Sequence, residues 1–210
     1  MPIHHKIGVD LDGVLCEFNH AYARLLAQAH GKDLLPPDWP ENREVFCCWG
    51  WDAYYGYPVV LQDRVWQKHI QGNPLFWESL GPMAGAKETL KKLNSLAEHG
   101  EIDCYFITNR RGTNVKLQSE WWLYKHGFNL PTVLLASDKV PIIRSLGLSV
   151  YVDDKIETML ELVATSEKEK WLHGTHFYLV DAPWNREGRT VGLQVVNSAK
   201  QALEDAVVWV

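Results

Sequence analysis

The sequence has few cysteines, and they follow no functional pattern. The four cysteines are Cys16, Cys47, Cys48 and Cys104. They show neither the spacing of zinc ligands nor that of a secreted disulfide framework, and adjacent Cys47 and Cys48 cannot bridge without strain. A disulfide-stabilised secreted domain is therefore excluded, and we expect a protein of the reducing cytoplasm.

The chain also lacks an excess of positive charge and lacks long apolar runs. It has 21 lysines and arginines against 26 aspartates and glutamates, a formal net charge of -5, which argues against a broad electrostatic surface for long nucleic acids. No apolar run approaches the length of a membrane span, so no membrane partner is expected. Its 210 residues suit one sizeable sheet core plus a small insert.

What the sequence does have is a short apolar run that ends in two aspartates, IGVDLDGVLCEF at residues 7–18. Side chains at i and i+2 of a strand share a face, so Asp10 and Asp12 would present both carboxylates at its carboxyl end. Neighbouring carboxylates repel, and they persist most readily where a cation binds or where one is a nucleophile and the other an acid or base. A calcium loop is the alternative, but it needs further oxygen ligands, whereas apolar residues follow Gly13.

Three later apolar segments repeat this pattern of a strand followed by polar residues. Because helical stretches separate them, they indicate a parallel sheet, whose ligands lie beyond the carboxyl ends of the strands. We therefore expect the polar residues to converge on one crevice. Segment 104–110 ends in Thr108 and Asn109, segment 132–139 in Ser137, Asp138 and Lys139, and segment 148–155 in Asp153, Asp154 and Lys155.

The order D-x-D-G-V, then T-N, then a lysine, then D-D resembles the haloacid dehalogenase superfamily of phosphotransferases. Within it, the chain resembles the 5'(3')-deoxyribonucleotidase family, by Phe18 eight residues after Asp10, an aromatic-rich insert and the late segment YLVDAPWN. The resemblance implies an α/β fold, with a Rossmann-like three-layer α/β/α parallel-sheet core and a small helical cap inserted after the first strand. The core is expected at residues 1–16 and 82–210, and the cap at residues 17–81.

The resemblance also implies a role for each motif in phosphoryl transfer, where a protein mainly positions groups and neutralises charge. Asp10 would attack phosphorus to form an aspartyl phosphate, and Asp12 would protonate the leaving alkoxide and later activate water. Thr108 and the backbone N–H of Asn109 would hold phosphate, and Lys139 would neutralise developing charge. The implied ligands of a Mg2+ ion are Asp10, Asp12 through its backbone carbonyl, Asp154 as the favoured direct ligand and Asp153 acting through water.

These residues also have ordinary structural interpretations. Thr108 and Asn109 would cap the next helix, Lys139 would be a surface lysine, and Asp153 and Asp154 would open the helix that follows them, where acids suit the helix dipole. Their shared placement favours the functional interpretation, because four independent structural roles would not be expected to reproduce one family's order.

The second motif departs from the family pattern, which is commonly threonine or serine, a small residue and proline. Here Arg110 and Arg111 follow Asn109. The two arginines either bind a second anionic group of the substrate or lie outward as solvated charges. We assign Arg110 to the substrate and favour the outward position for Arg111.

The aromatic residues of the insert allow two interpretations. A cap that closes over the crevice would exclude water and select the substrate, and rings there would stack on a nucleobase, a contact worth roughly 1 to 3 kcal/mol per base. Large rings also simply build the core of a small insert, which we favour for most of them. Phe18, Phe76 and Trp77 are the candidates for contact with the substrate.

The remaining elements are predicted from apolar spacing and from proline positions. In the insert we expect helices at residues 17–30 and 63–70 and a proline-broken loop at 34–40. After the last motif we expect a helix at 156–170, strands at 176–180 and 194–196, and a helix at 198–207. Asp181, Trp184 and Asn185 follow the strand at 176–180, and we interpret them as structural loop residues.

Together these features predict a Mg2+-dependent phosphomonoester hydrolase that dephosphorylates deoxynucleoside monophosphates. A phosphatase for a sugar phosphate or another small phosphate is one alternative. A phosphate-binding regulatory protein without turnover is another, which the intact set of motifs disfavours. A homodimer stays open as the assembly state.

Overall fold

The core of the protein is a parallel β-sheet, seen in a computed structural model that describes residues 5–168, 174–190 and 193–207. Its six strands run in the order β3-β2-β1-β4-β5-β6, and each neighbouring pair is parallel. The predicted parallel sheet is therefore confirmed, with residues 194–196 at one edge. The strands are β1 (His5–Val9), β2 (Ile102–Thr108), β3 (Thr132–Leu135), β4 (Val150–Asp153), β5 (His176–Val180) and β6 (Gln194–Val196).

Side chains of the central strands alternate between two apolar layers, as the period of two in a strand requires. In β4, Val150 and Val152 pack into the larger hydrophobic cluster, whereas Tyr151 packs into the smaller one on the other face. Gly8 in β1 has no room for a side chain, because a Cβ atom there would lie 2.4 Å from the Leu148 side chain. Both faces of the sheet are thus tightly packed.

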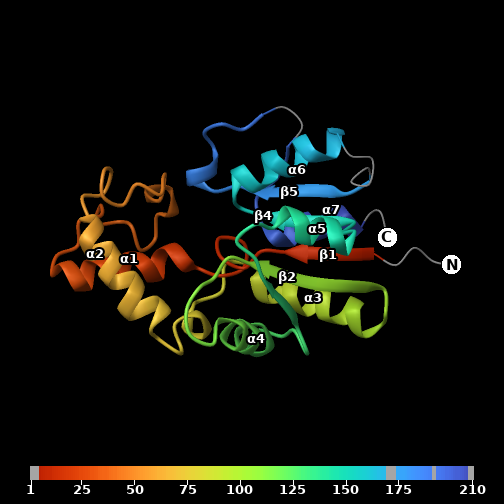
Figure 1. The fold of residues 1–210 in the computed structure, drawn as a ribbon, viewed down its shortest axis with the longest axis horizontal. Coiled ribbons are helices and arrows are strands. Elements are labelled where there is room, and N and C mark those ends of the chain that lie inside the picture. Colours follow the sequence, from red (N-terminus) through yellow and green to blue (C-terminus); the bar gives the residue numbers. More distant parts are fainter. Residues whose placement is uncertain (1–4, 169–173, 191–192, 208–210) are drawn as a thin grey trace.

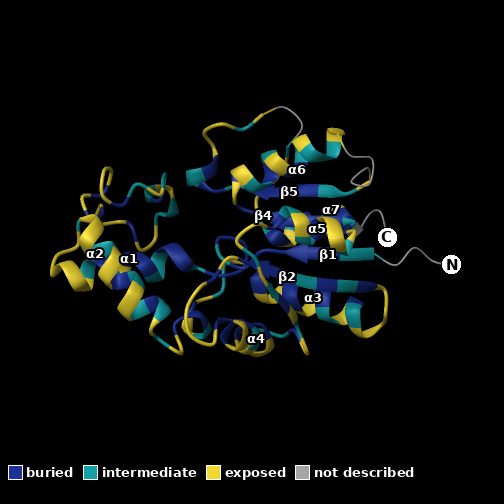
Figure 2. Ribbon diagram, viewed as in Figure 1, coloured by how far each residue is buried: buried dark blue, intermediate teal, exposed yellow. Residues whose placement is uncertain are grey.

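Helices cover both faces of the sheet and complete the predicted three-layer core (Figure 1). Their inner sides are buried and their outer sides are exposed (Figure 2). The larger cluster includes side chains of α3 (Ala86–Glu98), α4 (Val115–Lys125) and α7 (Ala199–Val207), and the smaller cluster includes side chains of α5 (Val140–Leu146) and α6 (Ile156–Lys168). The last two residues of the predicted helix 156–170 lie outside the described residues.

The segment between β1 and α3 carries a group of helices that lies beyond the carboxyl ends of the strands (Figure 1). It contains α1 (Phe18–His30) and α2 (Val59–Val65), which continues into a π-helix at Trp66–Gln71. The helix predicted at 63–70 thus begins earlier, because Pro58 ends the preceding loop and serves as N-cap. The division into a core and a cap at residues 17–81 stays a prediction.

Within the described ranges, no helix is long and apolar enough to cross a membrane.

Candidate active site

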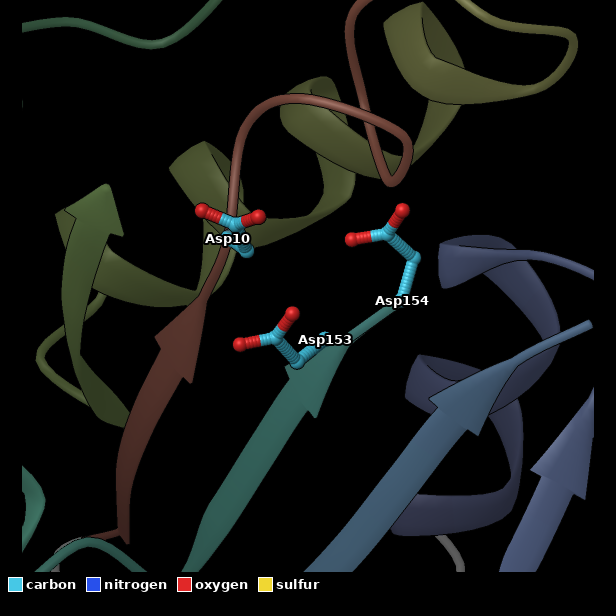
Figure 3. A group of neighbouring side chains, drawn as sticks. All are labelled: Asp10, Asp153 and Asp154. Atoms are coloured by element: carbon cyan, nitrogen blue, oxygen red, sulfur yellow. The ribbon is translucent and has the colours of Figure 1, made fainter. Parts of the chain in front are cut away.

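Three aspartates meet at the carboxyl edge of the sheet. Asp10 directly follows β1 and Asp153 ends β4, and these strands are neighbours in a register that pairs Val9 with Val152. Asp154 comes next in the chain, and the three carboxylates face a common space (Figure 3). One oxygen from each lies within 4.8 Å of the others, and all three side chains are buried. The predicted convergence of the first and last motifs is confirmed.

Lys139 supplies positive charge to this cluster. It is buried at the start of α5, and its Nζ lies 2.9 Å from Asp10 Oδ1 and 2.9 Å from Asp153 Oδ2. Burial opposes its charged form, but the two carboxylates outweigh that effect and raise the pKa of Lys139. Lys139 is therefore not the surface lysine of the structural interpretation.

The three carboxylates still outnumber the single ammonium group, and two of them have raised pKa values. Burial raises the pKa of Asp10 to about 7, with Lys139 acting against the rise and Asp153 adding to it. Burial and the neighbouring Asp153 and Asp10 also raise the pKa of Asp154 well above its usual value. Three carboxylates compensated by only one ammonium group fit a divalent cation of the hard, oxygen-preferring kind.

The two aspartates at the end of β4 differ in their partners. Asp153 Oδ2 accepts hydrogen bonds from Lys139 Nζ (2.9 Å) and the Tyr151 hydroxyl (2.6 Å), and its Oδ1 accepts one from the Lys155 backbone N–H (2.8 Å). Asp154 Oδ2 accepts a hydrogen bond from Trp184 Nε1 at 2.9 Å. Asp153 is thus held by the protein through both oxygens, and its indirect role toward a metal ion stays a prediction.

Trp184 and Asn185 support Asp154 from the loop after β5. Asn185 is fully buried, and its Nδ2 donates to the Asp154 and Val180 backbone carbonyls at 2.7 and 2.8 Å. Both residues line the same cavity as Asp10 and Lys139. Their interpretation as structural loop residues missed this contact with the carboxylate cluster. The available signal was their position after a strand, on the crevice side of the sheet.

Asp12 lies apart from the carboxylate cluster and is paired with Arg110. Arg110 Nε and Nη2 donate to Asp12 Oδ2 and Oδ1 at 2.8 and 2.7 Å, a two-pronged ion pair. The Arg110 guanidinium is buried and committed to a protein carboxylate, rather than free for a second anionic group of the substrate. Asp12 as a metal ligand through its backbone carbonyl stays a prediction.

The second motif lies at the same cavity. Thr108 ends β2 and is buried, whereas Asn109 is exposed, and both line the cavity. The N-cap of α4 is Asn114, so Thr108 and Asn109 do not fill the structural capping role.

A cavity of about 550 Å³ joins the carboxylate cluster to the aromatic insert. Phe18 and Trp77 line it and stack on each other, with ring centroids 5.7 Å apart. Phe76 is not among the lining residues and packs edge-on behind Trp77, with centroids 5.0 Å apart. Further aromatic rings that we interpreted as core also line it, namely Tyr22, Phe46, Trp49, Trp51 and Trp66.

The fold and the site define the class of protein. A haloacid dehalogenase family hydrolase from Deinococcus radiodurans R1, solved with phosphate and sodium, is 14% identical with a TM-score of 0.56, covering 100% of this chain and 97% of that one. A haloacid dehalogenase-like hydrolase from Xanthomonas campestris is 11% identical with a TM-score of 0.54, covering 99% and 97%. A hydrolase from Pseudomonas syringae is 16% identical with a TM-score of 0.53, covering 99% and 100%. The chain has the Rossmann-like fold of haloacid dehalogenase-type hydrolases.

A family model narrows this class. The model described as "5' nucleotidase, deoxy (Pyrimidine), cytosolic type C protein" matches residues 4–187, and the chain belongs to this family. The protein is therefore a phosphatase of the 5'-nucleotidase kind, with a small-molecule phosphate as substrate. No curated protein matches the sequence significantly.

Proposed function

We propose that the protein is a Mg2+-dependent phosphomonoesterase that acts through an aspartyl phosphate on Asp10 and dephosphorylates deoxynucleoside monophosphates. The observation that carries this proposal is the continuity of one cavity. Asp10, Asp12 and Lys139 line it together with aromatic rings of the insert. Such a cavity has room for a phosphate at one end and a nucleoside at the other.

The chemistry divides into two steps. A carboxylate oxygen of Asp10 attacks phosphorus, the bond to the ester oxygen breaks, and Asp12 gives a proton to the leaving alkoxide. Water then attacks the aspartyl phosphate and gives a proton to Asp12, and the bond between phosphorus and Asp10 breaks. Lys139, 2.9 Å from Asp10, offsets the negative charge that gathers there, and the Thr108 hydroxyl holds a phosphate oxygen.

The acidic cluster is the proposed magnesium site. Asp10 and Asp154 would bind the ion directly, and Asp153 would act through a water molecule. A bound Mg2+ would neutralise phosphate charge and hold the phosphate in line with the nucleophile. The fit rests on the donor set, three buried carboxylates with oxygens within 4.8 Å of one another. The phosphate and sodium in the Deinococcus radiodurans structure agree with a site for anions and cations in this fold.

The aromatic walls and the family support a nucleotide as substrate. The cavity is walled by aromatic rings from the insert and by Trp184 from the core. A nucleobase stacked on such a wall would gain roughly 1 to 3 kcal/mol. The family description names deoxy and pyrimidine substrates and a cytosolic type, which supports deoxynucleoside monophosphates and a cytoplasmic location. A homodimer stays a prediction.

The test is phosphate release from deoxynucleoside monophosphates, ribonucleoside monophosphates and sugar phosphates, with Mg2+ and with a chelator. Asp10→Asn should abolish release, whereas Asp52→Asn, an exposed aspartate of the insert, should not change it. Selective release from deoxynucleotides would support the full proposal. Release from sugar phosphates alone would keep the chemistry and reject the substrate, and release by Asp10→Asn would reject the nucleophile. No release from any of them would favour the phosphate-binding alternative.

A further inference from the structure

The buried Arg110 has an unusual position for an arginine beside a phosphate site. Arg110 and its partner Asp12 both line the cavity, but the Arg110 side chain is 0% exposed, whereas that of Asp12 is 22% exposed. The two donors on one edge of the guanidinium reach the two Asp12 oxygens at 2.8 and 2.7 Å. A fork of this kind fixes both the position and the plane of a carboxylate.

Other contacts hold the guanidinium itself. Arg110 Nη1 donates to the Ser119 hydroxyl of α4 at 3.0 Å, and Nη2 donates to Cys16 Sγ at 3.0 Å. Ser119 and Cys16 are both fully buried. The guanidinium also lies over the Trp77 ring, with Cζ 4.9 Å from the ring centroid. Arg110 is thus fixed by three segments of the chain, and it cannot swing toward a ligand without losing these contacts.

The same contacts join Asp12 to the wall of the cavity. Trp77 contacts the Arg110 guanidinium and also stacks on Phe18 at 5.7 Å with an interplanar angle of 19°. Trp77 and Phe18 both line the space that the leaving group would occupy. The chain of contacts Phe18, Trp77, Arg110 and Asp12 therefore runs from the aromatic wall to the acid/base.

We propose that Arg110 is a positioning residue for Asp12, rather than a substrate ligand. It holds the Asp12 carboxyl group so that the side not occupied by the fork faces the cavity. In the first step this side carries the proton that passes to the leaving oxygen, and in the second step its lone pair takes a proton from water. The inference rests on the proposed function, because it assigns Arg110 to the proton transfers of that two-step reaction. General acid-base catalysis is sensitive to such placement, since the proton must pass over hydrogen-bond distance.

The test separates proton transfer from phosphate binding by the choice of leaving group. A deoxynucleoside monophosphate releases an alkoxide that needs a proton, whereas p-nitrophenyl phosphate releases a phenolate that does not. Rapid-quench measurements give the rate of the first step from the released alcohol or phenol, and that of the second from phosphate. The variants are Arg110→Met and Arg110→Lys, which keeps the charge and loses the fork. The matched control is Arg111→Met, since the Arg111 side chain is exposed.

Arg110→Met should slow the first step with the nucleotide by roughly 10- to 100-fold, with a smaller loss for Arg110→Lys. The first step with p-nitrophenyl phosphate should stay close to that of the wild type, and the second step should slow equally for both substrates. Arg111→Met should leave both steps unchanged. Equal losses in the first step with both substrates would overturn the inference, because they would assign Arg110 to phosphate binding or to the fold.

A double-mutant comparison keeps the inference testable if the single variants lose stability. When Arg110 acts through Asp12, adding Arg110→Met to Asp12→Ala should slow nucleotide turnover little beyond Asp12→Ala alone. Multiplied losses would reject the inference. Failure of the proposed function looks different, because the wild type itself would then form no phosphorylated Asp10.

Discussion

Gly13 offers a direct test of the carboxylate cluster, because one added methyl group there meets a proposed metal ligand. Its φ is +81°, and a Cβ atom would lie 2.1 Å from Asp154 Oδ2. The left-handed conformation costs a residue with a Cβ atom about 1 to 2 kcal/mol. The Cβ atom would also lie 2.5 Å from Asp154 Cγ, so the buried carboxylate must move and lose its hydrogen bond from Trp184, which adds to the cost in stability.

We therefore expect Gly13→Ala to lower the free energy of unfolding by at least about 1 to 2 kcal/mol, which is at least about 2 to 8 °C in Tm for a chain of this length. The apparent affinity for Mg2+ should fall by at least the roughly 10- to 100-fold that follows misorientation of a ligand. The assays are thermal unfolding without metal and phosphate release as a function of Mg2+ concentration.

Gly31→Ala is the matched control. Gly31 has a similar φ of +78°, but nothing lies within 4 Å of its Cβ position. Gly31→Ala carries the backbone strain without the clash, so it should lose only the roughly 1 to 2 kcal/mol of that strain and keep its response to Mg2+. The reasoning is refuted if Gly13→Ala loses stability like Gly31→Ala and still binds Mg2+ as tightly as the wild type.

Three further predictions concern the same cluster. Trp184→Phe removes the hydrogen bond to Asp154 and should weaken Mg2+ binding about tenfold with little change in Tm, as a magnesium titration of activity would measure. Asn185→Ala removes the hydrogen bonds that Asn185 Nδ2 donates to the buried Asp154 and Val180 carbonyls, and it should cost about 2 to 4 kcal/mol of stability, measured by urea unfolding. A loss no larger than that of a substitution at an exposed residue would contradict this prediction. Burial raises the pKa of Asp10 from 3.8 to about 7, so the metal-free folded state binds a proton that the unfolded chain has released. Its free energy of unfolding should therefore fall from about pH 4 to pH 7 relative to Asp10→Asn, in unfolding curves recorded with a chelator, and a constant difference would contradict this.

The sequence was sufficient to predict the parts of the site that depend on strand order. The carboxyl ends of neighbouring parallel strands meet at one edge of the sheet. Asp10 and the Asp153–Asp154 pair lie at such strand ends, and Lys139 lies just before a helix at the same edge, so the strand order brings them together. The partner of Arg110 could not be predicted in this way. Asp12 and Arg110 are separated by 98 positions, and their pairing depends on how two loops fold over the sheet edge.

In the aromatic insert, the sequence pattern also failed to predict which rings line the cavity, because contacts with distant parts of the chain decide it. Phe76 and Trp77 are adjacent and chemically alike, yet Trp77 lines the cavity and Phe76 packs behind it. The difference comes from tertiary contacts: Trp77 Nε1 donates to the Arg111 carbonyl at 3.1 Å, and its backbone N–H donates to Gln118 Oε1 at 2.8 Å. Neither partner belongs to the insert, so no spacing within the insert could have identified them.

The two aspartates of the first motif show how one short segment can supply two different carboxylates. The rule that i and i+2 share a face holds only within a strand, and β1 ends at Val9. Beyond it the chain turns, so that Asp10 faces Lys139 and the acidic cluster while Asp12 faces Arg110. The turn gives each carboxylate its own cation, although the charge of Asp12 still contributes to the raised pKa of Asp10. A nucleophile needs a neighbour that neutralises phosphate charge, and an acid/base needs one that fixes its direction. Lys139, as a compact point charge, suits the first role, and the planar fork of Arg110 suits the second.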